Sequence, residues 1–304
     1  MMRRDFLLGS ATAGVAAVSA TQRISAQEQT AGMPRLTPPE KPAELNLCLQ
    51  WGAIPGTEMK EKLDFLEANG FAAVELPSGP WLFDNVEAMK KAMAGRRLFI
   101  ATACGPSDFS YVEAEKRDAE VAKFLPQLEV LGALKSVGLI LCPARSKPGL
   151  PFPELRDDFV NNTGKKLAEH AAKQGTSIVL EPLQRAETKF LRQVADGAAM
   201  ARDIGPGCTV MGDFWHMSKE ETSFMGAFLS AGKLLSHVHI ASLKNRKVPG
   251  VDGPADNYVD GFKGLKLLGY RGAVSLEGGF PKEMDKTQLI LNMVKLLREQ
   301  WAMA

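Results

Sequence analysis

The chain has 304 residues, of which 45% are hydrophobic and 24% are charged, a balance that is ordinary for a globular protein. This length allows one large α/β domain or two smaller domains. The formal net charge of +2 provides no general attraction to nucleic acid or to anionic lipid, so a nucleic-acid partner is not expected.

Residues 1–26 have the composition of an export signal: a basic start, a core rich in Ala, Gly, Leu and Val, and a small residue, Ala26, at the end. The core is too short and too weakly apolar for a stable membrane span. Arg3 and Arg4, followed by Asp-Phe-Leu, resemble the bacterial twin-arginine signal, which directs the export of folded proteins. We therefore expect cleavage after Ala26, with Ala20 as the alternative, and a periplasmic protein without a membrane anchor.

Residues 27–44 contain four prolines and are expected to form an extended tether. Residues 45–304 are expected to form a single catalytic domain, in which short apolar runs alternate with longer segments of helical period. The predicted strands are 45–51, 72–76, 98–104, 136–142, 177–181, 209–213, 236–241 and 273–277.

Near-continuous apolar strands that alternate with helices indicate a parallel sheet covered on both faces. Eight strand–helix units in about 260 residues match an α/β fold with a closed (β/α)₈ barrel, the TIM barrel. The clearest amphipathic segments are 58–70 and 256–270. A doubly wound open sheet is the alternative, but no GxGxxG motif follows the first strand. Four glycines stand where helices are expected to end: Gly70, Gly132, Gly175 and Gly269.

The four cysteines lie in or at the ends of predicted strands and form no CxxC motif. Although an oxidising compartment permits disulfides, we expect Cys48 and Cys208 to be buried thiols. The same is expected of Cys104 and Cys142, but both stand at strand ends, so a disulfide between these two is left open.

Four consecutive predicted strands carry polar residues at their ends. Glu181, Asp213 and Glu277 end the fifth, sixth and eighth strands, and His239 lies near the end of the seventh. In a TIM barrel these ends meet at one rim, where reactive groups collect. Three carboxylates placed there repel one another unless a cation binds between them. The four residues therefore predict a shared divalent metal site.

Three carboxylates and one imidazole favour Mn²⁺, with Co²⁺ or Mg²⁺ as alternatives. Structural zinc, which usually takes Cys and His ligands in a closed tetrahedron, fits poorly. Taken singly, a carboxylate after a strand is more often a helix cap or a solvated turn. The metal prediction therefore depends on four suitable ligands meeting at one rim.

Two further histidines are expected outside the metal site. His237 shares a strand face with His239 and is expected to pack one layer deeper, and His170 is expected on a helix surface. Four aromatic residues are interpreted either as walls of the site or as core residues: Trp51, Trp81, Phe214 and Trp215.

The second half of the chain contains, in this order, the segments LEPLQRAE, GDFWHM, HVHIASLKNRKVPG and SLEGG. Together they resemble the sugar isomerase/epimerase barrels related to xylose isomerase, above all the ketose 3-epimerases and hydroxypyruvate isomerase. The resemblance covers roughly residues 45 to 300 and is specific only in the second half. It implies that the metal is held by Glu181, Asp213, His239 and Glu277.

The same resemblance implies that Glu187, His216 and Arg246 bind substrate oxygens. Two features depart from the ketose 3-epimerases: Gln184 stands where these enzymes often have Asn, and the spacing from His239 to Arg246 is one residue longer. Both departures concern contacts to the substrate rather than to the metal.

The implied reaction is proton abstraction beside a sugar carbonyl, through an enediolate that the metal stabilises. Glu181 and Glu277 approach from opposite sides, so that one removes the proton and the other returns it. Return to the opposite face gives epimerisation, and return to the neighbouring carbon gives isomerisation. Loss of a β-substituent cleaves the glycoside, which is the reaction of a 3-keto-glycoside lyase. Phosphorylated sugars are mainly cytoplasmic, so an unphosphorylated sugar or keto-sugar is the expected substrate.

Two other classes of protein remain as alternatives. Abasic-site endonucleases share this barrel type, but their three-zinc site is rich in histidine, and this chain has only four histidines. A non-catalytic sugar-binding protein would keep the barrel without turnover. The expected partner is a small sugar molecule, and a homo-oligomer is left open.

Overall fold

The structure is a computed structural model that describes residues 39–104, 113–143 and 151–304. The predicted export signal, residues 1–26, lies outside the described residues, as does most of the predicted tether, residues 27–44. Both therefore stay predictions.

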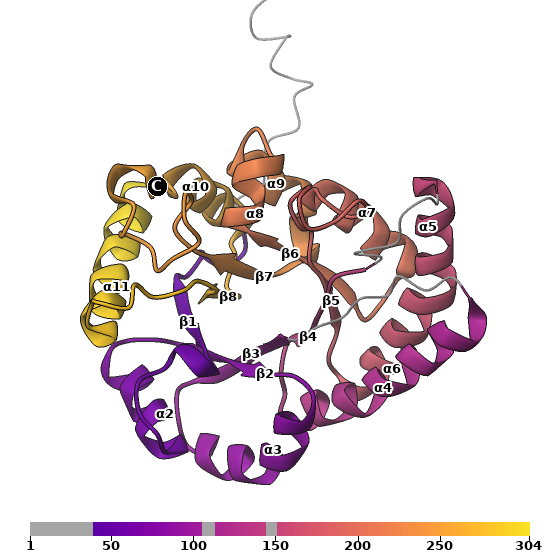
Figure 1. Cartoon of the computed structure of the whole chain (residues 1–304), viewed down its shortest axis with the longest axis horizontal. Coiled ribbons are helices and arrows are strands. Elements are labelled where there is room, and N and C mark those ends of the chain that lie inside the picture. The colour runs from indigo at the N-terminus through magenta and orange to yellow at the C-terminus, as the bar shows by residue number, and fades with distance from the viewer. Residues whose placement is uncertain (1–38, 105–112, 144–150) are drawn as a thin grey trace, which may run out of the picture. The chain divides into compact units, whose positions relative to one another are not determined.

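Eight parallel strands form a closed barrel, in which each strand pairs with the next and the last pairs with the first (Figure 1). Every predicted strand overlaps one of these eight, so the TIM barrel is confirmed and the open sheet is excluded. The strands are β1 (Asn46–Gln50), β2 (Ala73–Pro77), β3 (Phe99–Cys104), β4 (Gly138–Leu141), β5 (Ile178–Leu180), β6 (Cys208–Asp213), β7 (Leu235–Ile240) and β8 (Ala273–Leu276).

Helices form the outer layer around the strands (Figure 1). They are α2 (Met59–Ala68), α3 (Pro80–Met93), α4 (Ala114–Ala133), α5 (Phe152–Asp158), α6 (Lys165–Gln174), α7 (Val194–Ile204), α8 (Phe214–Glu220), α9 (Phe224–Ala231), α10 (Val259–Leu268) and α11 (Lys286–Met303). Shorter turns are η1 (Trp51–Ala53), the π-helical η2 (Phe159–Gly164), η3 (Gly232–Leu234) and η4 (Gly253–Ala255). Among the described helices, none has both the length and the apolar character needed to cross a bilayer.

The four glycines expected at helix ends all lie at or beside the end of a helix. Gly175 and Gly269 follow α6 and α10 with left-handed φ angles of 72° and 65°, and Gly70 follows the cap of α2. Gly132 is the next-to-last residue of α4, so it lies in the last turn of the helix rather than after it. A Cβ at Gly132 would lie 2.3 Å from the carbonyl oxygen of Gln174, so glycine is needed for the close approach of the end of α6.

The largest hydrophobic core takes side chains from strands and helices alike, as expected where helices cover a barrel. A separate cluster joins Cys48, Ala73, Ala101 and Ala273, which come from β1, β2, β3 and β8. Because β1 and β3 are not paired neighbours, side chains from both strands meet inside the barrel. These small side chains leave room in the interior for larger polar groups nearer the rim.

Candidate metal centre and substrate site

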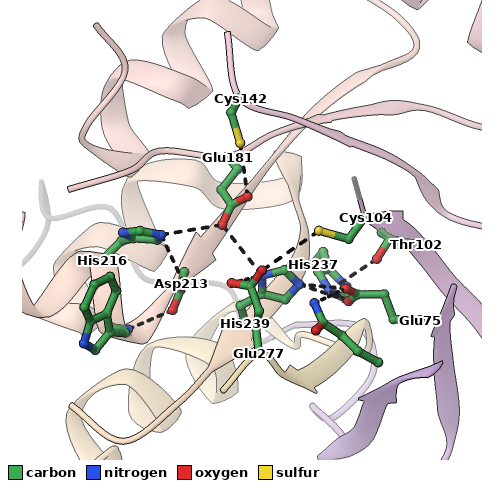
Figure 2. A network of polar contacts seen from close by, with 12 residues as sticks. Glu75, Thr102, Cys104, Cys142, Glu181, Asp213, His216, His237, His239 and Glu277 are labelled. Carbon is green, nitrogen blue, oxygen red and sulfur yellow. Dashed lines mark hydrogen bonds and ion pairs between the residues drawn. The ribbon is translucent and has the colours of Figure 1, made fainter. Parts of the chain in front are cut away.

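Four residues from consecutive strand ends meet at one point of the rim (Figure 2). Glu181 directly follows β5, Asp213 ends β6, His239 lies in β7, and Glu277 directly follows β8. One ligand atom from each of the four side chains lies within 4.8 Å of all the others. The structure therefore brings together the four residues predicted from the sequence to hold a metal.

The register of the parallel strands explains this meeting. Asp213 on β6 pairs with His239 on β7, and His239 pairs in turn with Ser275 on β8. Glu277 lies two residues beyond Ser275 and therefore projects to the same side of the sheet. The backbone N–H of Glu277 donates to Ile240 O (3.1 Å), and that of Glu181 donates to Leu141 O (2.9 Å), so both glutamates continue the ladders of their strands.

The cluster holds buried polar atoms that its neighbours do not satisfy. Within the described part of the chain, Glu181 Oε1, Asp213 Oδ2 and His239 Nδ1 find no hydrogen-bond partner. Buried polar atoms normally have one, and these three atoms belong to three of the four clustered side chains. Carboxylate oxygens and an imidazole nitrogen are ligands for divalent ions such as Mn²⁺. The side chains present therefore fit a divalent cation, although its identity stays a prediction.

The electrostatics of the carboxylates point the same way. Burial and the charge of Glu277 raise the pKa of Asp213 to about 7, and the same two causes raise the pKa of Glu181. Glu277 differs: although burial opposes its ionisation, the positive charges of His239 and Arg246 hold its pKa at about 2. The three carboxylates therefore do not all ionise readily on their own, and a bound cation would favour the ionised form of each.

His239 lies between this cluster and another buried carboxylate, that of Glu75 on β2 (Figure 2). Its Nε2 lies 3.0 Å from Glu75 Oε2, and its Nδ1 lies 3.2 Å from Glu277 Oε2. Burial opposes charging of this imidazole, but Glu75 and Glu277 raise the pKa of His239 well above its usual value. Glu75 was not predicted as a site residue, although it is a carboxylate inside an apolar run, which is a detectable signal.

The two histidines expected outside the metal site occupy the expected positions. His237 is fully buried, and its Nε2 lies 2.8 Å from Glu75 Oε2. His170 lies on α6, where its Nε2 is 3.2 Å from Glu129 Oε1.

His216, on α8, lies beside the cluster, and a backbone N–H group contacts the opposite side of its ring. The backbone N–H of Gln184 donates to His216 Nδ1 (3.1 Å), so Nδ1 acts as the acceptor and the neutral ring carries its proton on Nε2. That Nε2 lies 3.5 Å from Asp213 Oδ2 and 4.0 Å from Glu181 Oε1. His216 therefore turns its protonated Nε2 towards the cluster, where Arg246 Nη2 also lies 3.3 Å away.

Arg246 covers the same region from the loop after β7. Its Nη2 donates to Glu277 Oε2 (2.7 Å), and its guanidinium carbon lies 4.5 Å from the centroid of the Trp215 ring. Its Nη1 lies 3.6 Å from Glu187 Oε1. His216 and Arg246 thus lie beside the predicted metal ligands, and Glu187 lies next to both of them. Their roles stay predictions.

The backbone of Arg246 has a φ of 51°, a left-handed conformation that costs a non-glycine residue roughly 1 kcal/mol or more. Two aspartates hold the loop in this shape. Asp252 accepts from the backbone N–H of Lys244 (3.2 Å) and of Asn245 (2.9 Å). Asp256, only 2% exposed, accepts from the backbone N–H of Leu243 (2.9 Å), Gly250 (2.6 Å) and Asp252 (3.3 Å).

The four aromatic residues interpreted as walls of the site or as core residues separate into two groups. Phe214 is fully buried among aromatic rings, so it is a core residue. Trp215 lies under Arg246, as described above. Trp51 and Trp81 contact each other with ring centroids 5.2 Å apart, and Trp51 lines a cavity of about 290 Å³ that also reaches Glu277.

All four cysteines are free thiols. Cys142 Sγ lies 3.4 Å from Glu181 Oε2, and Cys104 Sγ lies 4.0 Å from Glu277 Oε1. The two cysteines left open for a disulfide are thus unbonded and adjoin the two clustered glutamates.

A closed eight-stranded barrel with three carboxylates and an imidazole clustered at its rim defines the class: a TIM barrel with a buried candidate metal centre. Residues 63–300 match the model of the xylose isomerase-like TIM barrel family. The chain belongs to this family, as its resemblance in sequence implied.

Several relatives of the chain are sugar epimerases. It is 30% identical over 251 residues to the 3-dehydro-D-guloside 4-epimerase of Escherichia coli (strain K12), covering 78% of this chain and 93% of that enzyme. It is also 30% identical to the L-ribulose 3-epimerase of Methylomonas sp. (strain DH-1), covering 69% of this chain and 71% of that enzyme. The crystal structure of the apo form of 3-keto-D-glucoside 4-epimerase from E. coli superposes with a TM-score of 0.74 and 27% identity, covering 84% of this chain and 100% of that one.

Proposed function

We propose that the chain is a divalent-metal-dependent epimerase of an unphosphorylated keto-sugar, with Glu181 and Glu277 as the groups that transfer the proton. The observation that carries this proposal is the set of unsatisfied buried atoms on Glu181, Asp213 and His239, which face one another at the rim. A cation held by these residues and Glu277 would supply a Lewis acid that polarises a sugar carbonyl and acidifies the adjacent C–H.

The two glutamates suit a two-sided proton transfer. They follow β5 and β8, which are separated along the barrel wall by β6 and β7, and they enter the cluster from different sides (Figure 2). A substrate carbon between them has one carboxylate on each face. One group removes the proton and the other returns it to the opposite face, which inverts the carbon.

His216 and Arg246 supply donors for substrate oxygens. The Nε2–H of His216 is held towards the cluster by the backbone N–H of Gln184, and Arg246 places a guanidinium beside Glu277. Both stabilise negative charge that develops on a carbonyl oxygen as the proton leaves. Glu187 accepts from Gln184 Nε2 (3.1 Å) and is placed to accept from a substrate hydroxyl.

For the substrate we propose a 3-keto-glycoside, with a free ketose as the alternative within the same class. The relative named 3-dehydro-D-guloside 4-epimerase supports this choice, because the match covers 93% of its length. A paired aromatic surface formed by Trp51 and Trp81 also offers an apolar face against which a sugar ring packs.

The test is proton NMR in D₂O of the Mn²⁺-treated protein with separate 3-keto-glycosides and free ketoses, the metal being removed before spectra are recorded. The expected result is deuterium at one carbon of an intact epimerised sugar, abolished by EDTA. Glu181→Gln and Glu277→Gln are each expected to lower exchange by about 100-fold or more, whereas Glu129→Gln, on a helix away from the site, serves as the matched control. Release of the aglycone would identify a lyase, and no exchange with bound metal would favour a sugar-binding protein.

A further inference from the structure

We infer that Glu75 is a positioning residue for the metal centre: it holds His239 with Nδ1 turned towards the clustered carboxylates, and so sets the affinity of the site for its cation. This inference rests on the proposed function only in requiring that a divalent cation binds at the cluster. Glu75 itself lies on the far side of His239 and faces the interior of the barrel (Figure 2).

Glu75 makes its contacts across the barrel rather than along the sheet. It lies on β2, whereas His237 and His239 lie on β7, and β8 and β1 separate the two strands along the wall. The carboxylate is 0% exposed. Its Oε2 lies 2.8 Å from His237 Nε2 and 3.0 Å from His239 Nε2, and its Oε1 accepts from Gln50 Nε2 at 2.9 Å.

These contacts determine which nitrogen of His239 carries the proton. An ionised carboxylate only accepts hydrogen bonds, so the nitrogen that faces it, Nε2 of His239, must be protonated. In the neutral ring, Nδ1 then carries a lone pair, and Nδ1 is the nitrogen that lies 3.2 Å from Glu277 Oε2 and 3.7 Å from Glu181 Oε1. A histidine that ligates a metal through one nitrogen commonly donates through the other to a carboxylate, which fixes the orientation of the ring.

Gln50 and His237 hold Glu75 in turn. Each donates to one of its two oxygens, so rotation of the carboxylate away from His239 would break at least one further bond. His237 thereby acquires a role that its sequence position alone did not predict, since it fixes the partner of a ligand instead of merely filling the interior.

The contrast with the neighbouring interior argues against a packing role for Glu75. The cluster formed by Cys48, Ala73, Ala101 and Ala273 shows that small apolar side chains fill the adjoining layer. A buried carboxylate paired with imidazoles is often no more stabilising than a well-packed apolar group of similar size. Glu75 is therefore better explained by the orientation of His239 than by the stability of the barrel.

The test measures the affinity of the EDTA-treated protein for Mn²⁺ by titration calorimetry, without any substrate. Glu75→Gln keeps the size of the side chain but replaces one acceptor oxygen by an amide donor. One of the two imidazole N–H groups then faces a donor and loses its hydrogen bond. We expect the affinity to fall about 10- to 100-fold, with turnover largely restored by excess Mn²⁺. The matched control, Glu129→Gln, changes a glutamate on α4 that contacts His170 rather than His239 and is expected to leave the affinity unchanged.

A different result would overturn the inference. If Glu75→Gln binds Mn²⁺ like the unmodified protein while its metal-free form unfolds at lower temperature, Glu75 serves only the barrel. If the unmodified protein itself binds neither Mn²⁺, Co²⁺ nor Mg²⁺, the metal in the proposed function fails instead.

Should Glu75→Gln not fold, ¹H–¹⁵N NMR of the unmodified Mg²⁺-loaded protein reports the protonated nitrogen of each histidine directly. A proton on Nε2 of His239 is expected, and a proton on Nδ1 would refute the inference.

Discussion

The substitution Asp256→Asn is expected to destabilise the protein and to disturb the site through the loop that carries Arg246. Asp256 is buried, and its two oxygens accept from three backbone N–H groups, those of Leu243, Gly250 and Asp252. An asparagine retains only one acceptor oxygen. Its NH₂ group must therefore face at least one of these N–H donors, and that donor loses its partner.

The magnitude follows from the bonds that are lost. A hydrogen bond to a charged group contributes roughly 1.5–3 kcal/mol, and a buried donor left without a partner costs about 1–3 kcal/mol. Depending on which oxygen is replaced, one or two backbone N–H groups are affected, so the free energy of unfolding is expected to fall by about 2–4 kcal/mol. The left-handed backbone at Arg246 adds to the tendency of the loop to relax once Asp256 no longer holds it.

Urea unfolding followed by circular dichroism measures this loss, and the KM of the sugar substrate reports the displacement of Arg246. Asp203→Asn is the matched control, because its ion pair with Arg156 is at the surface, with the Asp203 side chain 54% exposed, and contributes at most about 1 kcal/mol. If Asp256→Asn costs no more than this control and leaves KM unchanged, then the loop does not depend on the buried carboxylate and the reasoning is refuted.

Three further predictions concern protons and backbone contact. The pKa of Asp213 is raised to about 7, so below that pH a cation must displace a proton in order to bind. The affinity for Mn²⁺ is therefore expected to fall by up to about tenfold for each pH unit below about 7. Calorimetry on both sides of this pH measures the dependence, and an affinity that does not change with pH would contradict the prediction. Since the folded pKa lies above the ordinary 3.8, the metal-free protein should also lose stability as pH rises from about 4 through 7. Asp213→Asn should reduce this loss, and the raised pKa of Glu181 accounts for a further part of it. A Cβ at Gly278 would lie 2.7 Å from the backbone oxygen of Lys247, whereas a Cβ at Gly279 would first meet the flexible Lys247 amine at 3.2 Å. Gly278→Ala is therefore expected to be less stable than Gly279→Ala by about 1–3 kcal/mol, as measured by thermal unfolding.

The barrel and its rim were predictable because both follow from local sequence. Apolar runs that alternate with helical segments predict parallel strands, and a polar residue at the end of such a run must lie at the carboxyl rim. Glu181, Asp213 and Glu277 are visible in this way without knowledge of any contact. His239 was found by the same rule, since it stands one residue before the end of β7.

What escaped prediction depends on contacts across the barrel or between loops. Glu75 lies inside an apolar run, and only the closed barrel shows that it faces His239 across the interior. Gly132 was expected from its place at a helix end, but the close approach of Gln174, which would collide with a Cβ at this position, is visible only in the structure. The core position of Phe214 is set by rings from four other positions of the chain.

The same dependence on contacts separates the two glutamates that occupy equivalent strand ends. Glu277 Oε2 pairs with the guanidinium of Arg246 at 2.7 Å, whereas Glu181 Oε2 accepts from the uncharged thiol of Cys142 at 3.4 Å. The loops that carry Arg246 and Glu277 are also joined through their backbones, because the N–H of Gly279 donates to Arg246 O (3.0 Å).

The guanidinium of Arg246 is thus fixed beside Glu277 alone of the two, whereas His239 lies near both, 3.2 Å from Glu277 Oε2 and 3.7 Å from Glu181 Oε1. The pKa of Glu277 is accordingly lowered and that of Glu181 raised in the metal-free protein. Two residues of one type at matching positions thereby differ in proton affinity, as a reaction that needs both an acid and a base requires. The guanidinium of Arg246 adds to the charge of His239 in lowering the pKa of Glu277, so a change that frees the loop that holds Arg246 should reduce this difference even when both glutamates remain in place.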